Sequence, residues 1–411
     1  MRVLIAPSAF GGTLSAVEVA AAISDGWSRT SPADELDAFP VSGGGPGLVD
    51  VVHARLGGQL LVLSITGADG ATRVPALVLL TADADDGPIA WIEASQACPA
   101  PAGGRQPTRL PIAGPGGLGR GDPAGAARAR LGPATSRGVG ELVAAAVDAG
   151  ARTVVVGTDG VRVTDAGAGL LEVLGGSDPA ASVEAAAGRL AGVRLVAVGN
   201  SDEPLGEDAD SRGFADRLTA ALGQRAPREE PPVHPELAGL GEHAHAAGPA
   251  RRPGPDSSAS DAGVRPRPLV LLAPRVDRPL PARAGAGAGG GLGFALLVIG
   301  VRYRSGIAEV LRVTGFAAAV AASDLVLTGE GSFDHESRTG SAVGGVLAAA
   351  AEAGVAGVVL AGRSLLGSRE TRALGAASVY AVQDVAGWGG RGPAADVALL
   401  AERVARTWAR H

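Results

Sequence analysis

Short apolar runs alternate with glycine-rich turns and with helix-spaced apolar segments along this chain. The run Val3–Ala6 predicts a strand, and Ser15 and Glu18 have capping-box spacing at the start of the helix expected next. A second strand is expected near Glu35–Phe39, and the loop "PVSGGGPG" then leads into a second helix. Strand, glycine-rich loop and helix in repeated order indicate an α/β fold with a mainly parallel sheet.

The same hydrophobic patterns predict further strands and helices along the chain. Further strands are expected at 60–65, 74–80, 89–94, 153–156, 193–198, 269–273, 325–328, 357–361 and 379–382, and helices at 138–149, 170–174, 307–321 and the C-terminus. In the closing helix Val397, Leu400, Val404 and Trp408 share one face.

Two stretches lack this periodicity and set the expected domain plan. Residues 99–134 are rich in Pro, Gly and Arg and indicate a flexible insertion, and 223–268 indicate a disordered linker. We expect two α/β domains: a mainly parallel, Rossmann- or flavodoxin-like domain from 1–65 and 269–411, with a second α/β domain, 66–222, inserted in it.

Composition and net charge exclude some classes of function. Of 411 residues, 46% are hydrophobic and 3% aromatic, and the net charge is −6, which argues against nucleic-acid or membrane-surface binding. No apolar run is long enough to span a membrane, and Cys98 is the sole cysteine, so we expect a cytoplasmic protein without an internal disulfide. All 36 basic side chains are arginine, so no mechanism here can use a lysine.

The segment "LTGEGSFDHESRTGSAVGG", residues 327–345, concentrates polar groups between an expected strand and helix. With the strand ending at Thr328, Glu330 and Asp334 would lie beside the next helix N-terminus, where carboxylates bind Mg²⁺ or accept a proton. Arg338 would bind an anion bidentately. A solvated turn with helix-capping acids explains the same residues.

Other glycine-rich loops also follow expected strands or open helices. Because ligands bind at the carboxyl ends of strands in open α/β sheets, such loops suit phosphate or carboxylate. Asp165, in "VTDAGAG", is either a helix cap or a carboxylate aimed at substrate. Gly accounts for 64 residues, so glycine-rich loops also arise by chance, and G-x-G-x-x-G at Gly285, Gly287 and Gly290 carries little weight.

Together, "RVLIAPSAFGGTLSAVEVAAAI", "SGGGPGLVD", "TSRGVGELVAAAVDAGARTVVVG", "TDAGAGLLEVLG", "GAGAGGGLGFALL" and "SDLVLTGEGSFDHESRTG" resemble the type I glycerate kinase family. The resemblance covers about 270 residues from both ends of the chain. It implies two α/β domains with the active site between them. It also implies ATP and Mg²⁺ as cofactors, with a small hydroxy acid and a nucleotide as ligands.

The sequence departs from the family's pattern at several positions. Ser8, Ala9 and Gly11 stand where the first loop usually has Asp, Ser and Lys, and Gly43 replaces an Asp of the second loop. Asn200 replaces the first Asp of another motif. A Phe-Gly-Pro-Gln-Lys-Gly segment is missing, and Ser341 replaces a lysine. Phosphoryl transfer depends on positioning and charge neutralisation, so lost cations bear directly on catalysis.

Two functions remain open. In the first, the chain is an ATP-dependent kinase acting on glycerate or a similar small hydroxy acid. Asp165 is then the base, and Glu330 and Asp334 handle Mg²⁺ or substrate. The expected substrate- and phosphate-binding residues are Ser42, Gly44, Gly287, Gly290, Gly291, Ser337 and Arg338. In the second, it is an inactive homologue that binds a metabolite or a partner protein. The sequence predicts neither the metal ligands as a set nor the oligomeric state.

Overall fold

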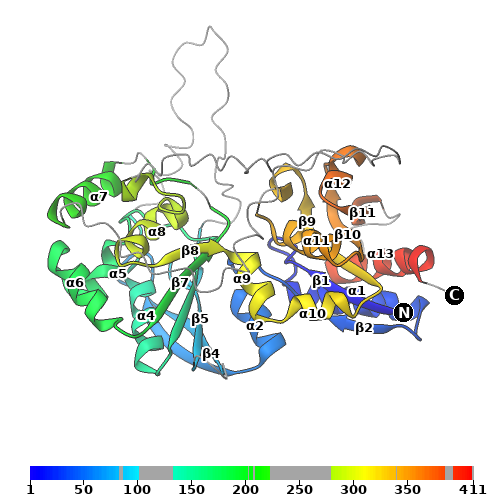
Figure 1. Cartoon of the computed structure of the whole chain (residues 1–411), viewed down its shortest axis with the longest axis horizontal. Coiled ribbons are helices and arrows are strands. Elements are labelled where there is room, and N and C mark those ends of the chain that lie inside the picture. The colour runs from blue at the N-terminus through cyan, green and yellow to red at the C-terminus, as the bar shows by residue number, and fades with distance from the viewer. Residues whose placement is uncertain are drawn as a thin grey trace, which may run out of the picture. The chain divides into compact units, whose positions relative to one another are not determined.

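The structure is a computed structural model that describes residues 1–82, 87–100, 133–201, 203–206, 209–222, 279–338, 340–384 and 392–409. Most of the expected insertion at 99–134, the expected linker at 223–268 and the expected strand at 269–273 lie outside these residues. The described elements form two sheets with helices packed against them (Figure 1).

The first sheet is wholly parallel, with strand order β11-β10-β9-β1-β2. Its strands are β1 (Arg2–Pro7), β2 (Glu35–Ala38), β9 (Leu325–Phe333), β10 (Ala356–Ser364) and β11 (Ala376–Ala381). The chain therefore enters this sheet at its N-terminus and returns to it after the whole second sheet has been built, as the resemblance implied.

Helices cover both faces of the first sheet because its central strands are apolar on both sides. The helices α1 (Ala16–Thr30) and α13 (Pro393–Trp408) bury Ile23 and Leu400 against Ile5 and Leu327 on one face. On the other face lie α9 (Gly306–Val313), α10 (Phe316–Ala321) and α11 (Ala342–Glu352), and α12 (Ser368–Ala373) precedes β11. The expected capping box of Ser15 and Glu18 opens α1.

The second sheet is mixed, with order β3-β4-β5-β6-β7-β8. Its strands are β3 (Gln59–Thr66), β4 (Arg73–Thr81), β5 (Ile89–Glu93), β6 (Thr153–Gly157), β7 (Arg194–Gly199) and β8 (Arg302–Ser305). The pairs β3–β4 and β4–β5 are antiparallel, and the remaining neighbours are parallel.

This pairing differs from the expected domain boundaries for two strands, β3 and β8. Strand β3 hydrogen-bonds to β4, and β8 hydrogen-bonds to β7, so both belong to the second sheet. We had placed them in the segments 1–65 and 269–411. Strand β8 was also not predicted, because its four residues, "RYRS", carry no apolar run. That the two sheets form separate domains stays a prediction.

The helices of the second sheet are α2 (Leu48–Leu56), α4 (Arg137–Asp148), α5 (Ala168–Gly175), α6 (Pro179–Arg189), α7 (Ala209–Leu222) and α8 (Ala288–Val298). Helices α4, α5 and α8 bury apolar side chains in one large core, and α2 packs on Leu79, Trp91 and Val155. Helices α6 and α7 were not predicted. Short 3₁₀ helices occupy Ala94–Gln96, Leu280–Ala282, His335–Arg338 and Val382–Asp384.

Two element boundaries differ from expectation. Strand β9 continues past Thr328 to Phe333, because its extension pairs with β10 as far as Ser364. The expected helix 307–321 is split into α9 and α10, because Gly315 adopts a φ of 74°, a left-handed conformation that ends a helix.

Candidate functional site

Loops from the tips of both sheets meet at Asn200, the residue that follows β7. The Ser42–Gly47 loop, which leads from β2 to α2, passes so close that a Cβ at Gly43 would lie 2.6 Å from Asn200 Nδ2. On the other side, a Cβ at Gly340, in the β9–α11 connection, would lie 3.6 Å from Asn200 Oδ1. Asn200 is therefore a point at which loops from the carboxyl ends of strands in both sheets come together, the edge where α/β proteins commonly bind ligands.

Asp159 lies at this meeting point and was not predicted. It follows β6, and its Oδ1 accepts a hydrogen bond of 3.0 Å from Asn200 N. A Cβ at Gly45 would be 3.2 Å from Asp159 Cβ, so the carboxylate lies under the Ser42–Gly47 loop. Burial raises the pKa of Asp159 to about 6, although the amide hydrogen bond opposes the rise. Its place directly after the strand "TVVVG" was the signal that could have identified it.

Hydroxyl groups next to Asp159 join the tips of three strands. Tyr303, on β8, has its hydroxyl 3.2 Å from Thr158 Oγ1 and accepts a 3.3 Å hydrogen bond from Ser201 N. Thr158 Oγ1 also donates to the carbonyl of Val198. These contacts hold the ends of β6, β7 and β8 in one arrangement, so the loops that follow them are positioned by the sheet.

Glu330 lies in the extension of β9, where burial and a neighbouring acid act on it together. Burial raises its pKa to about 7, Asp334 adds to the rise, and a hydrogen bond from the Ser337 hydroxyl opposes it. Its Oε1 is buried and has no hydrogen-bond partner among the described residues. A half-buried carboxylate with one unsatisfied oxygen suits a ligand that brings a proton or a positive charge.

Asp334 is held by the turn that follows Glu330. Its carboxylate accepts from Ser332 Oγ at 2.8 Å and from Glu336 N at 3.0 Å, and its own N–H donates to Ser337 Oγ at 3.0 Å. Arg363 Nε, on β10, donates to Ser332 Oγ at 3.0 Å. Arg363 thus reaches Asp334 through the Ser332 hydroxyl, and the side chains of Arg363 and Arg338 are both exposed.

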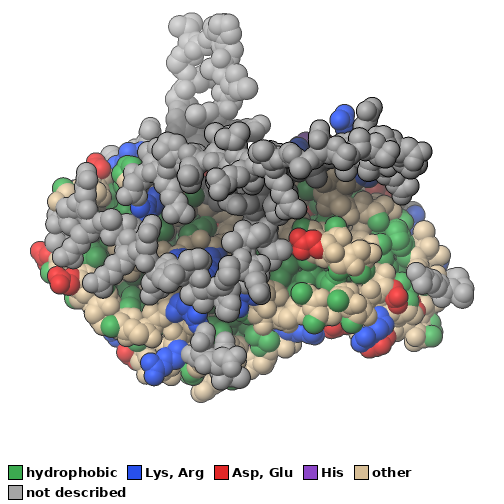
Figure 2. Space-filling view, viewed as in Figure 1, with side chains coloured by type: hydrophobic (Ala, Val, Ile, Leu, Met, Phe, Trp, Pro, Cys, Tyr) green, Lys and Arg blue, Asp and Glu red, His purple; other side chains and the backbone are tan. Residues whose placement is uncertain are grey.

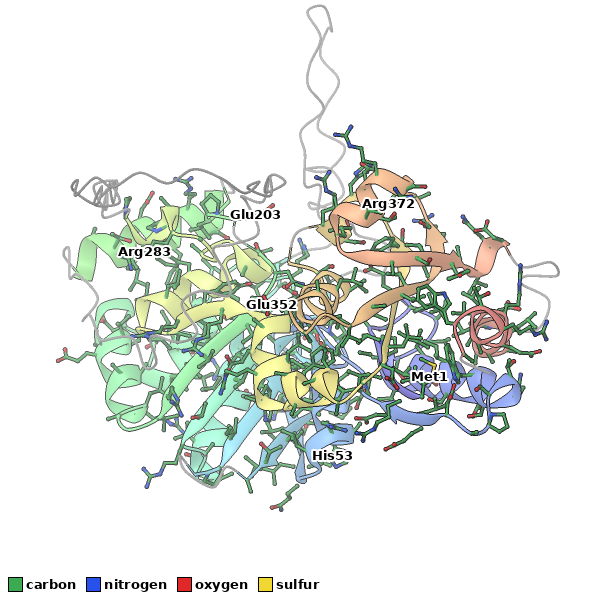
Figure 3. The ribbon with its side chains drawn as sticks, turned by 45° about the vertical axis from the view of Figure 1, so that its right-hand side comes forward. Met1, His53, Glu203, Arg283, Glu352 and Arg372 are labelled. Atoms are coloured by element: carbon green, nitrogen blue, oxygen red, sulfur yellow. The ribbon has the colours of Figure 1, made fainter. Side chains whose placement is uncertain are left out.

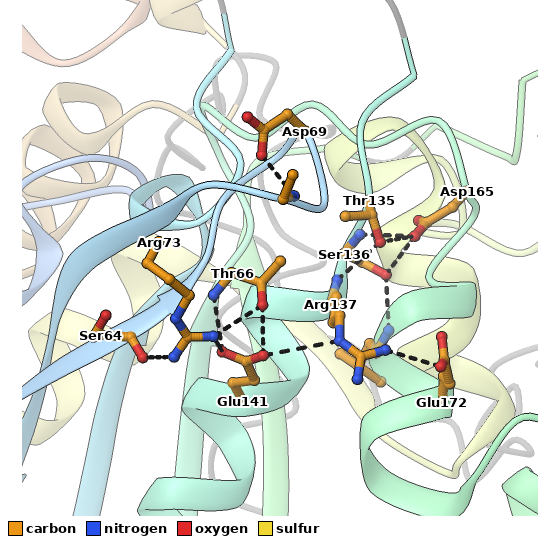
Figure 4. Close-up of polar contacts among 12 residues, drawn as sticks. Ser64, Thr66, Asp69, Arg73, Thr135, Ser136, Arg137, Glu141, Asp165 and Glu172 are labelled. Carbon is orange, nitrogen blue, oxygen red and sulfur yellow. Dashed lines mark hydrogen bonds and ion pairs between the residues drawn. The ribbon is translucent and has the colours of Figure 1, made fainter.

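Asp165 has a different environment (Figure 4). Its carboxylate accepts five hydrogen bonds of 2.7 to 3.1 Å. Oδ2 accepts four of them, from Thr135 Oγ1, Ser136 N, Ser136 Oγ and Gly169 N. Oδ1 accepts the fifth, from Gly167 N. These groups belong to the starts of α4 and α5. Asp165 therefore joins two helices, and no hydrogen bond in the described structure ties it to Glu330.

The glycines that open α8 pack against neighbouring backbone. A Cβ at Gly287 would lie 2.3 Å from the carbonyl oxygen of Pro204, and one at Gly290 would lie 2.3 Å from that of Val163. Gly291 faces Ala166 and Leu205 in the same way. Backbone hydrogen bonds also hold the start of α8: Gly287 N donates to the carbonyl of Glu203, and Ala286 N donates to the carbonyl of Arg283 (Glu203 and Arg283 are labelled in Figure 3). Close packing thus accounts for these glycines, and their role toward phosphate stays a prediction.

The start of α2 is already occupied by an internal acid. Glu93, at the end of β5, accepts a 2.7 Å hydrogen bond from Val49 N, and burial raises its pKa. Ser42 Oγ accepts from Gly44 N at 3.2 Å, and a Cβ at Gly44 would lie 2.9 Å from the carbonyl oxygen of Val198. The first N–H groups of α2 therefore have a partner and are not free for an anion.

A family model described as the glycerate kinase family matches residues 3–120, 121–207 and 269–409. The chain belongs to the glycerate kinase family. An uncharacterized protein of Mycobacterium bovis is 35% identical over 388 residues, which cover 94% of this chain and 85% of that protein. The glycerate kinase of Bacillus subtilis is 31% identical over 176 residues, covering 43% of this chain and 40% of its own length.

A solved structure supports the fold. The putative glycerate kinase 2 of Salmonella typhimurium LT2 superimposes with a TM-score of 0.63 at 24% identity, covering 99% of this chain and 98% of that one. The expected fold class, α/β with mainly parallel sheets, is confirmed. Two positions at which this member of the glycerate kinase family departs from the motifs, Gly43 and Asn200, contact each other, and Asn200 also donates its N–H to Asp159.

Glu330 and Asp334 fit a magnesium ion better than a multi-ligand metal centre. The described residues contain no group of three or more His, Cys, Asp or Glu side chains placed to hold a metal. Mg²⁺ in kinases needs only one or two carboxylates, with water and substrate phosphates completing its shell. The unsatisfied Oε1 of Glu330 beside a second carboxylate meets that requirement.

Charge on the visible surface is mixed. Figure 2 shows acidic and basic side chains on the described part of this face.

A search of the described helices finds none with the length and apolar character to cross a membrane.

Proposed function

We propose that this chain is an ATP-dependent kinase that phosphorylates a hydroxyl group of glycerate or of a similar small hydroxy acid. Family membership supports the reaction class. The observation that carries the proposal is Glu330, a half-buried carboxylate with an unsatisfied oxygen whose pKa is raised in part by Asp334. It lies on strand β9, and the connection that follows this strand reaches Asn200 of the other sheet.

Glu330 and Asp334 would hold Mg²⁺, which neutralises charge on the transferred phosphoryl group when bound. Burial and the charge of Asp334 both disfavour the ionised form of Glu330, so a bound cation would relieve this cost. Arg363 would supply the positive charge that other kinases take from lysine, since its guanidinium donates to the Ser332 hydroxyl, which in turn donates to Asp334. A cytoplasmic location remains a prediction.

The test is to incubate the purified protein with Mg·ATP and a panel of two- and three-carbon hydroxy acids, following ADP and the phosphorylated acid. We expect product with at least one acid, and a loss of about 10²-fold or more in kcat/KM for Glu330→Gln. Glu336→Gln, an exposed acid in the same turn, is the matched control and should retain activity.

A readout that needs no turnover tests the metal site. Without nucleotide, at about pH 8, Mg²⁺ should raise the Tm of the wild type and of Glu336→Gln but not that of Glu330→Gln. Equal Mg²⁺ shifts in all three proteins would remove Glu330 from the metal site. Absence of product with every acid would end the kinase proposal.

The alternative, an inactive member that binds ATP or a metabolite, is favoured by two observations. The chain has no lysine, and the carboxylate of Asp165 accepts five structural hydrogen bonds. Calorimetric titration showing ATP binding without ADP release would favour this alternative. Formation of a phosphorylated acid would exclude it.

A further inference from the structure

The site contains an acid that its expected functional residues did not include. Asp159 accepts only one hydrogen bond among the described residues, from Asn200 N to Oδ1, so its second oxygen is available. Asp165, the acid first expected to act as base, accepts five. The two carboxylates follow the same strand, six residues apart, but Asp165 holds together the starts of two helices, whereas Asp159 has one oxygen without a bonded donor.

Asp159 is also placed where the ligand-binding edges meet. It is half-buried beneath Gly45 and bonded to the backbone of Asn200, whose side chain lies between Gly43 and Gly340. Gly340 lies in the connection that follows β9, the strand that contains Glu330, and Asp334 opens this connection. The acid therefore projects from the second sheet toward a point that the first sheet also reaches.

We propose that Asp159 is the general base that accepts the proton of the substrate hydroxyl, an inference that rests on the proposed kinase function. The hydroxyl oxygen forms a bond to the γ-phosphorus as its proton passes to the free carboxylate oxygen. The bond between that phosphorus and the β,γ-bridging oxygen breaks, and ADP leaves with the electron pair. Asp159 then releases the proton to solvent, giving the phosphorylated acid, ADP and H⁺.

The surroundings of Asp159 suit this task. Burial raises its pKa to about 6, close to the range in which a base both is ionised and binds a proton effectively. The groups facing it are Gly45 from the Ser42–Gly47 loop, the Asn200 amide from the β7 tip, and the hydroxyl network of Thr158 and Tyr303. No charged side chain among the described residues contributes to its pKa.

The test compares Asp159→Asn with the wild type between about pH 5 and 9. We expect kcat/KM to fall by about 10²-fold or more, and the acid limb of the wild-type profile, near pH 6, to disappear. Calorimetric affinities for ATP and for the hydroxy acid should stay within about threefold. Asp159→Ser is a second neutral variant, and Asp148→Asn, an exposed acid on α4, is the control that should keep wild-type kinetics.

The outcomes separate the two proposals. If the wild type forms no product, the kinase function and the base assignment both fall. If the wild type is active but the neutral variants keep their activity within about threefold and retain the acid limb, only the assignment of Asp159 falls. If activity and acid affinity are lost together, Asp159 binds substrate and is not its base. In folded Asp165→Asn protein we expect the acid limb to persist, and its loss would return the role to Asp165.

Discussion

Local environment gives the buried acidic and thiol groups of this chain different chemistry. Glu330 and Asp159 are removed from water without a compensating cation, so the pKa values of both carboxyls rise to about 7 and about 6. In Glu309, burial would also raise the pKa, but hydrogen bonds and charges from Arg312 and Arg304 outweigh it and lower the pKa. Function is therefore expected at the unpaired acids.

Cys98 provides a prediction at the scale of one residue. It is fully buried, its Sγ donates to the carbonyl of Thr135, and burial raises the pKa of the thiol to about 12, with the Asp165 charge adding to the rise. Because the thiolate is the nucleophile, native protein should not react with iodoacetamide at about pH 8. Mass spectrometry should find one alkylated site only after denaturation. Rapid labelling of the native chain would contradict this environment.

Residue patterns predicted some of these environments but not others. The polarity of 327–345 drew attention to Glu330, whose site role stays a prediction, yet nothing in the sequence showed that β9 would continue through it and bury it. Asp165 was noticed for its loop, but its donors at 135–136 lie about thirty positions away in the chain. Burial and hydrogen-bond saturation arise from such distant contacts, and periodicity does not report them.

Asp165 acts at the scale of the elements it joins. Asp165→Ala would leave N–H groups at the starts of α4 and α5 without an acceptor, and we expect a loss of about 3 kcal/mol in the free energy of unfolding. Urea unfolding measures it. Glu172→Ala, on α5, removes only an exposed ion pair with Arg137 and should cost less than about 0.5 kcal/mol. Equal costs would show that the network is not structural.

The glycines of α8 allow a second test at this scale. Gly290 has a φ of 78°, and a Cβ there would meet the carbonyl of Val163 at 2.3 Å, whereas Gly300, with a φ of 86°, faces open space. Gly300→Ala should therefore cost about 1 kcal/mol from backbone strain alone, and Gly290→Ala about 3 kcal/mol or more. Thermal unfolding without nucleotide checks this. Similar costs would mean that packing does not explain the α8 glycines.

The elements themselves were easier to predict than their membership in a sheet. Apolar runs identified the strands β1, β3, β4, β5, β6 and β7 within a residue or two. However, only hydrogen-bonded register assigns β3 and β8 to the second sheet. Most apolar residues of α6 and α7 are alanine, and few larger apolar side chains mark a helical period. Pairing depends on partners remote in sequence, so it could not be read locally.

In the molecule as a whole, the two sheets are packed onto shared elements. Helix α9 places Ile307 in the core of the first sheet and Val310 in that of the second. Both sheets belong to one compact unit of the chain. A change in either core therefore acts on the stability of both sheets, and the buried acids Asp159 and Glu330 should influence global unfolding.

The sign of that influence can be worked out. Asp159 and Glu330 bind protons more tightly in the folded state, because their pKa values rise to about 6 and about 7. Their contribution to the free energy of unfolding is therefore complete below the pKa values of the unfolded chain. It is lost as the pH rises through about 6 for Asp159 and about 7 for Glu330. Glu141 and Glu309 behave oppositely. Burial alone would raise their pKa values, but hydrogen bonds and arginine charges lower them, so their stabilisation disappears as pH falls below the usual carboxyl range.

Stability of the protein without ligands should therefore be greatest near about pH 5 and fall toward about pH 8, as calorimetric Tm values across that range would measure. The double variant Asp159→Asn, Glu330→Gln should show a much flatter profile between about pH 5 and 8 and a higher Tm than wild type at the alkaline end. The gain would come from removing two charges that burial disfavours, at the expense of catalysis. A wild-type Tm that rises steadily from about pH 5 to 8 would mean that neither acid is held as the structure places it.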